Sequence, residues 1–542
     1  MKFHRTIATA AFALMASVGA VSLSHAQCAP ATCSRIGDVN GDGAPDVLDV
    51  TLVIGTAFRG QPKSHWLGSD DLNGDGISSD VIDVTMMINI AFRGGSQAFP
   101  YRVYRLTGRL GAGTWHLVDD DSLQNRIYGV FSVGTDDVNG SLDTVSVCPK
   151  TDTLIVCPGT VVQGDTSHAV PSAIVIRRTG YAQVVGTEAK PVVFTSMMPV
   201  GSRNRSDWGG FVINGAAPNN NRPTYVENTE GGLNVGIGGG NIPHDNSGCF
   251  VYLREEYSGR EFSLDNELNG ITVNSVGDGT TLDYVQVNAS ADDGIEWFGG
   301  RVNVKHFVVS NYDDDSFDSD VGAEWKGQFL IASIDENAGN SANHEGFEWD
   351  NHPDPATEYD NLPRMMPTVY NATLVGMGHN FVAVSNSGIH QRRGAALQIF
   401  NTVWTRFKAA IDFDNDPSCS RLIAADSIHI QKSVWYDVGK WADDGDSLGN
   451  QMRDNVALGN ELYVNAPANP ALAPILVAAS FSDPGFPDYR PVSPSNPINL
   501  DTKVGVTPPN DGFFDPTATF LGAVKANDPT PWYAGWTQFA EH

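Results

Sequence analysis

A short acidic phrase returns three times in the middle of the chain, and each copy places an apolar residue directly before a carboxylate. The copies are Asp293-Gly294-Ile295-Glu296, Asp315-Ser316-Phe317-Asp318 and Glu345-Gly346-Phe347-Glu348, with a looser copy at Ala410-Ile411-Asp412. Neighbouring side chains of an extended strand point to opposite faces, so each carboxylate lies on one face and each apolar side chain on the other. The copies are about one coil of a parallel solenoid apart. The sequence therefore predicts that Glu296, Asp318 and Glu348 stack from coil to coil.

Such a stack has an electrostatic consequence. Adjacent strands lie ~4.8 Å apart, and ionised carboxylates at that spacing repel one another unless a cation or water intervenes. Carboxylate oxygens are the hard ligands that Ca²⁺ prefers. Two interpretations remain open: Glu296, Asp318 and Glu348 form a Ca²⁺ site, or they form a hydrated acidic face.

The same stretch offers carboxylates that could act in catalysis. A glycoside hydrolase uses two carboxyl groups ~5–9 Å apart, and the candidates here are Asp292, Asp293, Asp314, Asp315 and Glu345. Of the other elements of a polygalacturonase-like site, Gly378-His379-Asn380 supplies only a part, and the Arg-x-Lys element is missing. Arg392-Arg393 offers the basic residue that a lyase needs beside bound Ca²⁺. The sequence favours an acidic groove or a structural Ca²⁺ site without catalysis, and glycan cleavage is the alternative.

Histidine and tryptophan side chains flank the acidic stretch. His344 and His352 are either transition-metal ligands or, more simply, surface histidines in a wet loop. Trp297, Trp325 and Trp349 either stack on sugar rings or alternate into the core.

Two stretches near the N-terminus have the spacing of EF-hand-like calcium loops, with oxygen ligands at alternate positions and a glycine at the sharp turn. In the first loop the expected ligands are Asp38, Asn40, Asp42, the Ala44 carbonyl, Asp46 and Asp49. In the second loop they are Asp71, Asn73, Asp75, the Ile77 carbonyl, Asp80 and Asp83. Each loop is followed by a similar apolar segment, at 50–60 and 84–94, which predicts one short helix each.

This duplicated loop and helix resembles the type I dockerin family over residues 36–96. The resemblance implies a small module that folds around Ca²⁺ and docks onto a cohesin-like partner. Val47 and Leu48 occupy the region where dockerins carry recognition residues, and they are apolar here. Docking onto the chain's own following domain is therefore the alternative.

After residue 97 the chain consists of many short strands broken by Gly, Asn, Asp and Pro, without helices between them. This pattern allows a sandwich, a barrel or a solenoid, and the repeated acidic phrase favours the solenoid. Several phrases resemble a group of secreted bacterial right-handed parallel β-helix proteins: Cys157-Pro158-Gly159-Thr160, 190–196, Trp208-Gly209-Gly210, 292–300, 519–523 and 534–537. We expect an all-β, right-handed parallel β-helix preceded by a small α-helical calcium-binding module. The Pro-rich stretch from about residue 467 is expected to cap the open coil end.

The N-terminus has the pattern of a secretory signal peptide, with Lys2 and Arg5, an apolar run and the small-x-small site Ser24-His25-Ala26. No later stretch is long and apolar enough for membrane insertion. The formal net charge is −29, which argues against a nucleic-acid partner. The predicted organisation is a signal peptide at 1–26, a dockerin-like module at 36–96 and a β-helix domain with an irregular C-terminal cap at 101–542.

Six cysteines in an exported chain predict disulfides. Sequence leaves the connectivity open, and proximity favours Cys28 with Cys33 and Cys148 with Cys157, which leaves Cys249 for Cys419.

Taken together, the sequence predicts a secreted or cell-surface protein. In it, a dockerin-like module anchors a β-helix used for extracellular attachment or polysaccharide binding. The alternative is a polysaccharide-degrading enzyme carried by its dockerin.

Overall fold

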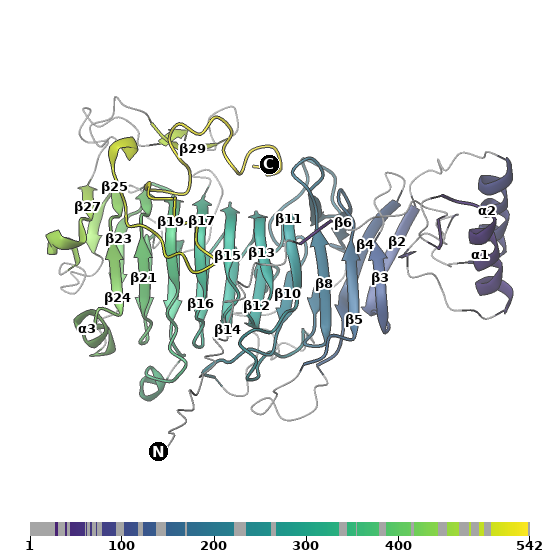
Figure 1. The fold of residues 1–542 in the computed structure, drawn as a ribbon, viewed down its shortest axis with the longest axis horizontal. Helices are drawn as coiled ribbons and strands as arrows, with labels where there is room; N and C mark the ends of the chain where they lie inside the picture. The colour runs from purple at the N-terminus through teal and green to yellow at the C-terminus, as the bar shows by residue number, and fades with distance from the viewer. Residues whose placement is uncertain are drawn as a thin grey trace, which may run out of the picture.

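The computed structural model is a long parallel β-helix with a small helical unit at its N-terminal end (Figure 1). The structure describes residues 28–30, 38–40, 44–59, 61, 66–67, 72, 79–93, 102–117, 123–136, 148–167, 171–221, 235–261, 267–334, 344–353, 355–378, 386–413, 417–442, 452–464, 476–478, 487–492 and 500–539. The expected signal peptide lies outside these residues. The predicted fold class, a parallel β-helix preceded by a small helical unit, is confirmed.

The strands stack in parallel rows, because each strand pairs with its equivalents in the coils before and after it. We call the row that carries the acidic phrases row 1; it contains β7 (Ala173–Ile176), β10 (Gly210–Asn214), β12 (Ile271–Val276), β14 (Ile295–Gly300), β16 (Asp315–Asp320), β18 (Glu345–Asp350), β20 (Ile389–Arg392), β23 (Ala409–Phe413) and β26 (Lys440–Ala442). Row 2 contains β8 (Gly180–Val185), β9 (Val192–Ser196), β11 (Gly248–Glu256), β13 (Thr281–Asn288), β15 (Val304–Ser310), β17 (Lys326–Ser333), β19 (Thr368–Val375), β21 (Leu397–Phe400), β22 (Val403–Thr405), β24 (Ile428–Gln431), β25 (Val434–Val438) and β27 (Glu461–Val464).

The remaining elements lie at the two ends of the described chain. The first coils are built from β2 (Arg102–Arg109), β3 (Gly113–Leu117), β4 (Leu123–Val133), β5 (Asp152–Val156) and β6 (Val161–Gly164). Towards the C-terminus lie α3 (Pro417–Ala424) and the antiparallel pair β28 (Leu476–Ala478) and β29 (Asp488–Pro491). Short 3-10 turns lie at Ala356–Glu358, Val456–Leu458 and Leu500–Thr502. Within the described residues, no helix has the length and apolar character to cross a membrane.

The helical unit consists of α1 (Val47–Arg59) and α2 (Val81–Arg93), which pack on a small apolar core of their own. Between the two helices, β1 (Trp66–Leu67) pairs in parallel with β3 of the β-helix. Backbone hydrogen bonding therefore attaches the helical unit to the first coils.

The long strands of row 2 turn a sharp corner at a single residue with left-handed backbone. In four successive coils this residue is Tyr252, Tyr284, His306 and Phe329, with φ values of 49°, 54°, 47° and 59°. Later coils place Asn371, Asn401 and Lys432 at corners with similar φ values. Left-handed backbone is unfavourable for aromatic residues, so these corners are strained.

The C-terminal residues 500–539, which we call the strap, form the larger described part of the stretch that is expected to cap the open coil end. They lie along the side of the solenoid (Figure 1), because side-chain amides of successive coils bind the strap's backbone. For example, Gln286 Nε2 donates to Gln538 O at 2.7 Å, and Asn401 Nδ2 donates to Val506 O at 2.7 Å.

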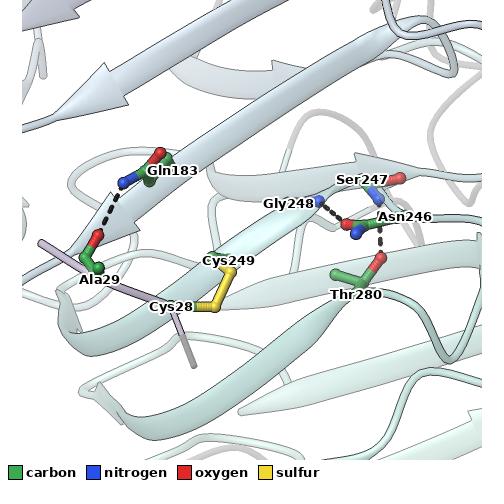
Figure 2. Close-up of a disulfide and its surroundings, with 8 residues drawn as sticks. All are labelled: Cys28, Ala29, Gln183, Asn246, Ser247, Gly248, Cys249 and Thr280. Carbon is green, nitrogen blue, oxygen red and sulfur yellow. Dashed lines mark hydrogen bonds between the residues drawn. A yellow bond between two sulfur atoms is a disulfide. The ribbon is translucent and has the colours of Figure 1, made fainter. Parts of the chain in front are cut away.

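A disulfide joins Cys28 to Cys249 in β11, across 221 residues of sequence (Figure 2). In addition, Gln183 Nε2 in β8 donates to Ala29 O at 2.8 Å, which fixes the segment 28–30 against row 2. Cys148 and Cys419 keep their thiols. The pairing expected from proximity is therefore wrong for all five described cysteines, namely Cys28, Cys148, Cys157, Cys249 and Cys419.

Candidate functional site

The strand register of row 1 places the predicted carboxylates in one column. Glu296 in β14 pairs with Asp318 in β16, and Asp318 pairs with Glu348 in β18. The column continues with His390 in β20 and Asp412 in β23. The predicted stacking is confirmed, and the looser copy at Asp412 joins the column after one histidine.

A second set of carboxylates lies where these strands begin, and it forms a hydrogen-bonded ladder. Asn269 Oδ1 accepts from the backbone N–H of Asp293 at 3.3 Å, and Asp293 Oδ1 accepts from that of Asp315 at 2.8 Å. Asp315 Oδ1 in turn accepts from the N–H of Glu345 at 2.8 Å. These carboxylates therefore have a structural role, since each one joins its coil to the next.

The two sets meet in one cluster of carboxylates, which we call the acidic cluster. Four groups of three residues each offer ligand atoms that lie within 4.8 Å of one another. The members are Asp292, Asp293, Glu296, Asp314, Asp315, Asp318, Glu345 and Glu348. The structure thus brings together all of the predicted catalytic candidates and all three predicted column ligands.

Burial and mutual repulsion dominate the electrostatics of the acidic cluster. Desolvation, followed by the charges of neighbouring carboxylates, raises the pKa values of Asp293, Asp315 and Asp318 well above the usual range. The same two causes raise the pKa of Asp314 to about 8. So many carboxylates are costly to ionise together at neutral pH without a counter-ion. The donor set, made of closely spaced carboxylate oxygens, fits a hard cation such as Ca²⁺.

Basic side chains from β20 close one end of the acidic cluster. Arg392 Nε donates to both carboxylate oxygens of Asp350, at 2.9 and 3.0 Å, and its Nη2 donates to Glu348. His390 Nδ1 lies 2.9 Å from Glu348 Oε2. Burial alone would raise the pKa of Glu348, but the hydrogen bond from His390 and the charge of Arg392 lower it. Burial alone would lower the pKa of Arg392, but the carboxylates of Glu348 and Asp350 raise it. Arg392 therefore stays protonated, which disfavours it as a lyase base.

Sequence reasoning missed His390 and the pairing role of Arg392. The two residues alternate along β20 as Glu348 and Asp350 alternate along β18, but this match becomes visible only when the register of the two strands is known.

The flanking histidines and tryptophans are not where a ligand could reach them easily. His344 and His352 are buried, so the expectation of surface histidines is wrong. Burial lowers the pKa of His344 to about 4, which keeps its ring neutral. Trp297, Trp325 and Trp349 are also buried, and the first two rings stack at 4.3 Å in the core. The alternative that these three rings bind sugar is therefore wrong.

In the N-terminal loops, the described carboxylates cap the two helices. Asp49 Oδ1 accepts from the N–H groups of Val39 and Asn40 at 2.6 and 2.9 Å, and its Oδ2 accepts from Asp46 N at 2.7 Å. In the second unit, Asp83 makes the equivalent bonds to Leu72 N and Asp80 N, at 2.7 and 2.9 Å. These contacts with the residue before each helix are of the capping-box type.

The described loop residues include Asp38, whose side chain is buried, Asn40 and Ala44. The other expected ligands lie outside the described residues: Asp42, Asp71, Asn73, Asp75 and Ile77.

Comparison with known proteins adds one match. A family model described as a pectate-lyase-like β-helix domain matches residues 137–462. No dockerin or EF-hand family model matches the chain. No curated protein and no solved structure matches it. Because the family match covers more than half of the sequence and includes the acidic cluster, the chain belongs to the pectate-lyase-like β-helix family.

Proposed function

We propose that this protein binds polysaccharide outside the cell through a Ca²⁺ ion held by the acidic cluster. The observation that carries the proposal is the set of four carboxylate triads with ligand atoms within 4.8 Å. Ca²⁺ takes six to eight oxygen ligands, so an ion bound there can accept sugar hydroxyl or carboxylate oxygens as well as protein oxygens. Membership of a pectate-lyase-like family supports a polysaccharide as the ligand.

The helical unit, residues 36–96, serves in this proposal as a Ca²⁺-dependent dockerin-like module. Apolar side chains are exposed at equivalent positions of its two helices. Val47 and Leu48 of α1 are 53% and 56% exposed, and Val81 and Ile82 of α2 are 60% and 49% exposed. This duplicated apolar surface supports a cohesin-like partner, which would hold the exported protein at a cell surface or in a complex.

A glycan array with and without Ca²⁺, combined with a reducing-sugar release assay on the glycans that bind, tests the proposal. We expect Ca²⁺-dependent binding without release, and we expect Asp318→Asn to weaken the binding at least tenfold. Asp320→Asn, in the same strand but outside the four triads, is the matched control. The proposal is contradicted if no glycan on the array loses binding both in EDTA and in the Asp318→Asn variant.

Glycan cleavage is the second candidate, and a specific geometry favours it. Asp318 and Glu348 are register partners whose carboxylate oxygens lie within 4.8 Å, close to the ~5 Å spacing of a nucleophile and an acid in retaining glycosidases. This candidate requires that the release assay detects new reducing ends. It also requires that Asp318→Asn and Glu348→Gln each abolish the release.

A further inference from the structure

A cavity of about 530 Å³ lies on row 2, away from the strands that carry the acidic cluster. Its floor crosses four successive coils, since Val185, Val251, Asp283 and Lys305 are register partners. At ~4.8 Å per coil, these four positions span roughly 14 Å. The cavity is therefore an elongated groove, which suits a chain-like ligand, and its volume lies within the range of ligand sites.

Both walls of this groove come from the ends of the chain, and both are fixed in place. One wall contains Cys28 and Pro30. Figure 2 shows that the disulfide to Cys249 anchors this wall. The other wall contains Gly512 and Phe513 of the strap, and Lys305 Nζ donates to Phe513 O at 2.9 Å. Fixed walls reduce the entropy that a ligand loses on binding, because less of the site must be ordered.

Two tyrosine rings line the groove at strained corners. Tyr252 and Tyr284 stack with ring centroids 4.6 Å apart, and both residues are half-buried. Their left-handed backbone is costly for tyrosine, whereas asparagine adopts it readily and occupies equivalent corners at Asn371 and Asn401. Both rings also make edge contacts with Trp536 of the strap, at 5.8 and 6.2 Å between ring centroids, so these corners help to hold the strap beside the groove.

The polar side chains of the groove are mixed in sign. Asp283 and Lys305 supply one carboxylate and one ammonium group, and the neutral polar residues are Thr187, Thr281 and Asn303. Burial, followed by the charges of Glu188 and Asp283, raises the pKa of Tyr252, so its phenol stays protonated and can donate a hydrogen bond to a ligand. Because these lining residues carry one charge of each sign, they give an anionic ligand no net attraction. A ligand with many hydroxyl groups and apolar C–H faces would use both the polar side chains and the rings.

We propose that this groove binds a neutral oligosaccharide independently of Ca²⁺ and of the acidic cluster. The sugar's C–H face packs on Tyr252, and its hydroxyl groups bond to Asp283, Asn303 and Lys305. The protein then has two glycan-binding faces, one that needs a cation and one that does not.

Calorimetric titration of the full chain in EDTA tests this proposal. The probes are neutral hexasaccharides, namely cellohexaose, xylohexaose, mannohexaose and laminarihexaose, with hexagalacturonate as the charged comparison. We expect saturable binding of at least one neutral probe, and weaker or no binding of hexagalacturonate. Because asparagine suits the corner, Tyr252→Asn keeps the fold and is expected to weaken binding at least tenfold.

Two further variants separate this site from the acidic cluster. Asp283→Asn keeps the side-chain volume and is expected to weaken binding about fivefold, on the scale of one ordinary hydrogen bond. Asp318→Asn is expected to leave the affinity within twofold, whatever its effect on Ca²⁺-dependent binding. The proposal is overturned if no neutral probe binds, if hexagalacturonate binds more tightly, or if Tyr252→Asn binds like the unsubstituted protein.

Discussion

The strand register holds the carboxylates of the acidic cluster close together, and some of them accept backbone hydrogen bonds. At this spacing they also repel one another. Their pKa values are raised, to about 8 for Asp314 and well above the usual range for Asp318. A carboxyl group with a raised folded-state pKa stabilises the fold fully below its unfolded pKa of about 4, and it loses this contribution as the pH rises through the folded value. The cluster should therefore destabilise the protein at neutral pH unless a cation is bound.

The first prediction follows from this loss of stability with rising pH. In EDTA, the melting temperature should fall between pH 5 and pH 8, and Ca²⁺ at pH 8 should restore it. Ca²⁺ in hundredfold excess over Kd adds roughly 2.7 kcal/mol. Differential scanning calorimetry of the full chain and of Asp318→Asn measures both effects, and the variant should show a smaller Ca²⁺ response. Equal Ca²⁺ responses would show that the cluster is only a hydrated acidic face.

The second prediction concerns Glu255, a buried carboxyl group far from the acidic cluster in sequence. Its register partners in β9 and β13 are the buried residues Phe194 and Val287, so its side chain points into the coil. Burial raises its pKa well above the usual range. Glu255→Gln should therefore raise the melting temperature by several degrees at pH 8, and the gain should disappear towards pH 4.

The neighbouring residue is a matched control for this experiment. Glu256 is also buried, but its Oε1 accepts from Arg254 Nε at 2.9 Å. Glu256→Gln loses a charged hydrogen bond and should lower the melting temperature at pH 8. If both variants shift the melting temperature at pH 8 in the same direction, burial of an unpaired charge does not explain the effect of Glu255→Gln.

At the residue scale, the sequence predicted those side-chain positions that follow from the repeat of the strands. The column of Glu296, Asp318 and Glu348 follows from period-two alternation and coil length, and the strand register confirms it. The partnership of Arg392 with Glu348 and Asp350 depends on where β20 begins, which the sequence does not mark. The pairing of Arg392 with these two carboxylates could be found only once the position of β20 in its coil was known.

At the scale of elements, the helix-capping carboxylates of the N-terminal unit are also the predicted last ligands of the calcium loops. Asp49 and Asp83 each accept two or three backbone N–H groups. A carboxylate held in this way is pre-positioned for a cation, but capping alone also explains it. Measurement of Ca²⁺ stoichiometry separates the two explanations.

The third prediction is that the double variant Asp49→Asn/Asp83→Asn loses two Ca²⁺ sites. Isothermal titration of the full chain should show the stoichiometry falling by about two, because each loop would lose its final carboxylate ligand. Asp318→Asn, as the control, should keep both of these sites. An unchanged stoichiometry in the double variant would mean that the two carboxylates serve only as caps.

The sequence located the strands but not their corners. Short strands were predicted after residue 97, and the stretch 190–196 named there contains β9. Within β13, however, Tyr284 adopts left-handed backbone and bends the strand. Tyrosine favours extended structure locally, so only the stacking of equivalent corners in neighbouring coils can impose this conformation.

At the scale of the whole molecule, contacts between distant segments were the hardest to predict. The entropy cost of closing a loop rises only slowly with its length. Nearness in sequence was therefore a weak guide to the disulfide between Cys28 and Cys249. The pairing of β1 with β3 and the path of the strap along the coils likewise depend on surfaces that exist only after the solenoid has formed.

The strap covers apolar side chains that the coils leave on their outer surface. Val308, Ile331 and Val403 form one buried cluster with Leu521 and Val524 of the strap. The side-chain amides described above hold the strap's backbone as a neighbouring strand would. Without the strap, this apolar surface would meet water, and such patches promote association.

The last prediction is that a chain ending at residue 499 melts at least 10 °C lower than the full chain and binds the hydrophobic dye ANS. The reason is that the apolar side chains beneath the strap become exposed to water. Asn401→Asp is the matched local control, since it keeps a residue that tolerates left-handed backbone but removes the donor to Val506 O. One lost hydrogen bond costs about 1 kcal/mol, so this variant should melt only a few degrees lower and bind no dye. If the shortened chain melts like the full protein, the strap is an appendage and the coils are stable without it. If Asn401→Asp is as harmful as the truncation, the hydrogen bonds to the strap matter more than the apolar surface that it covers.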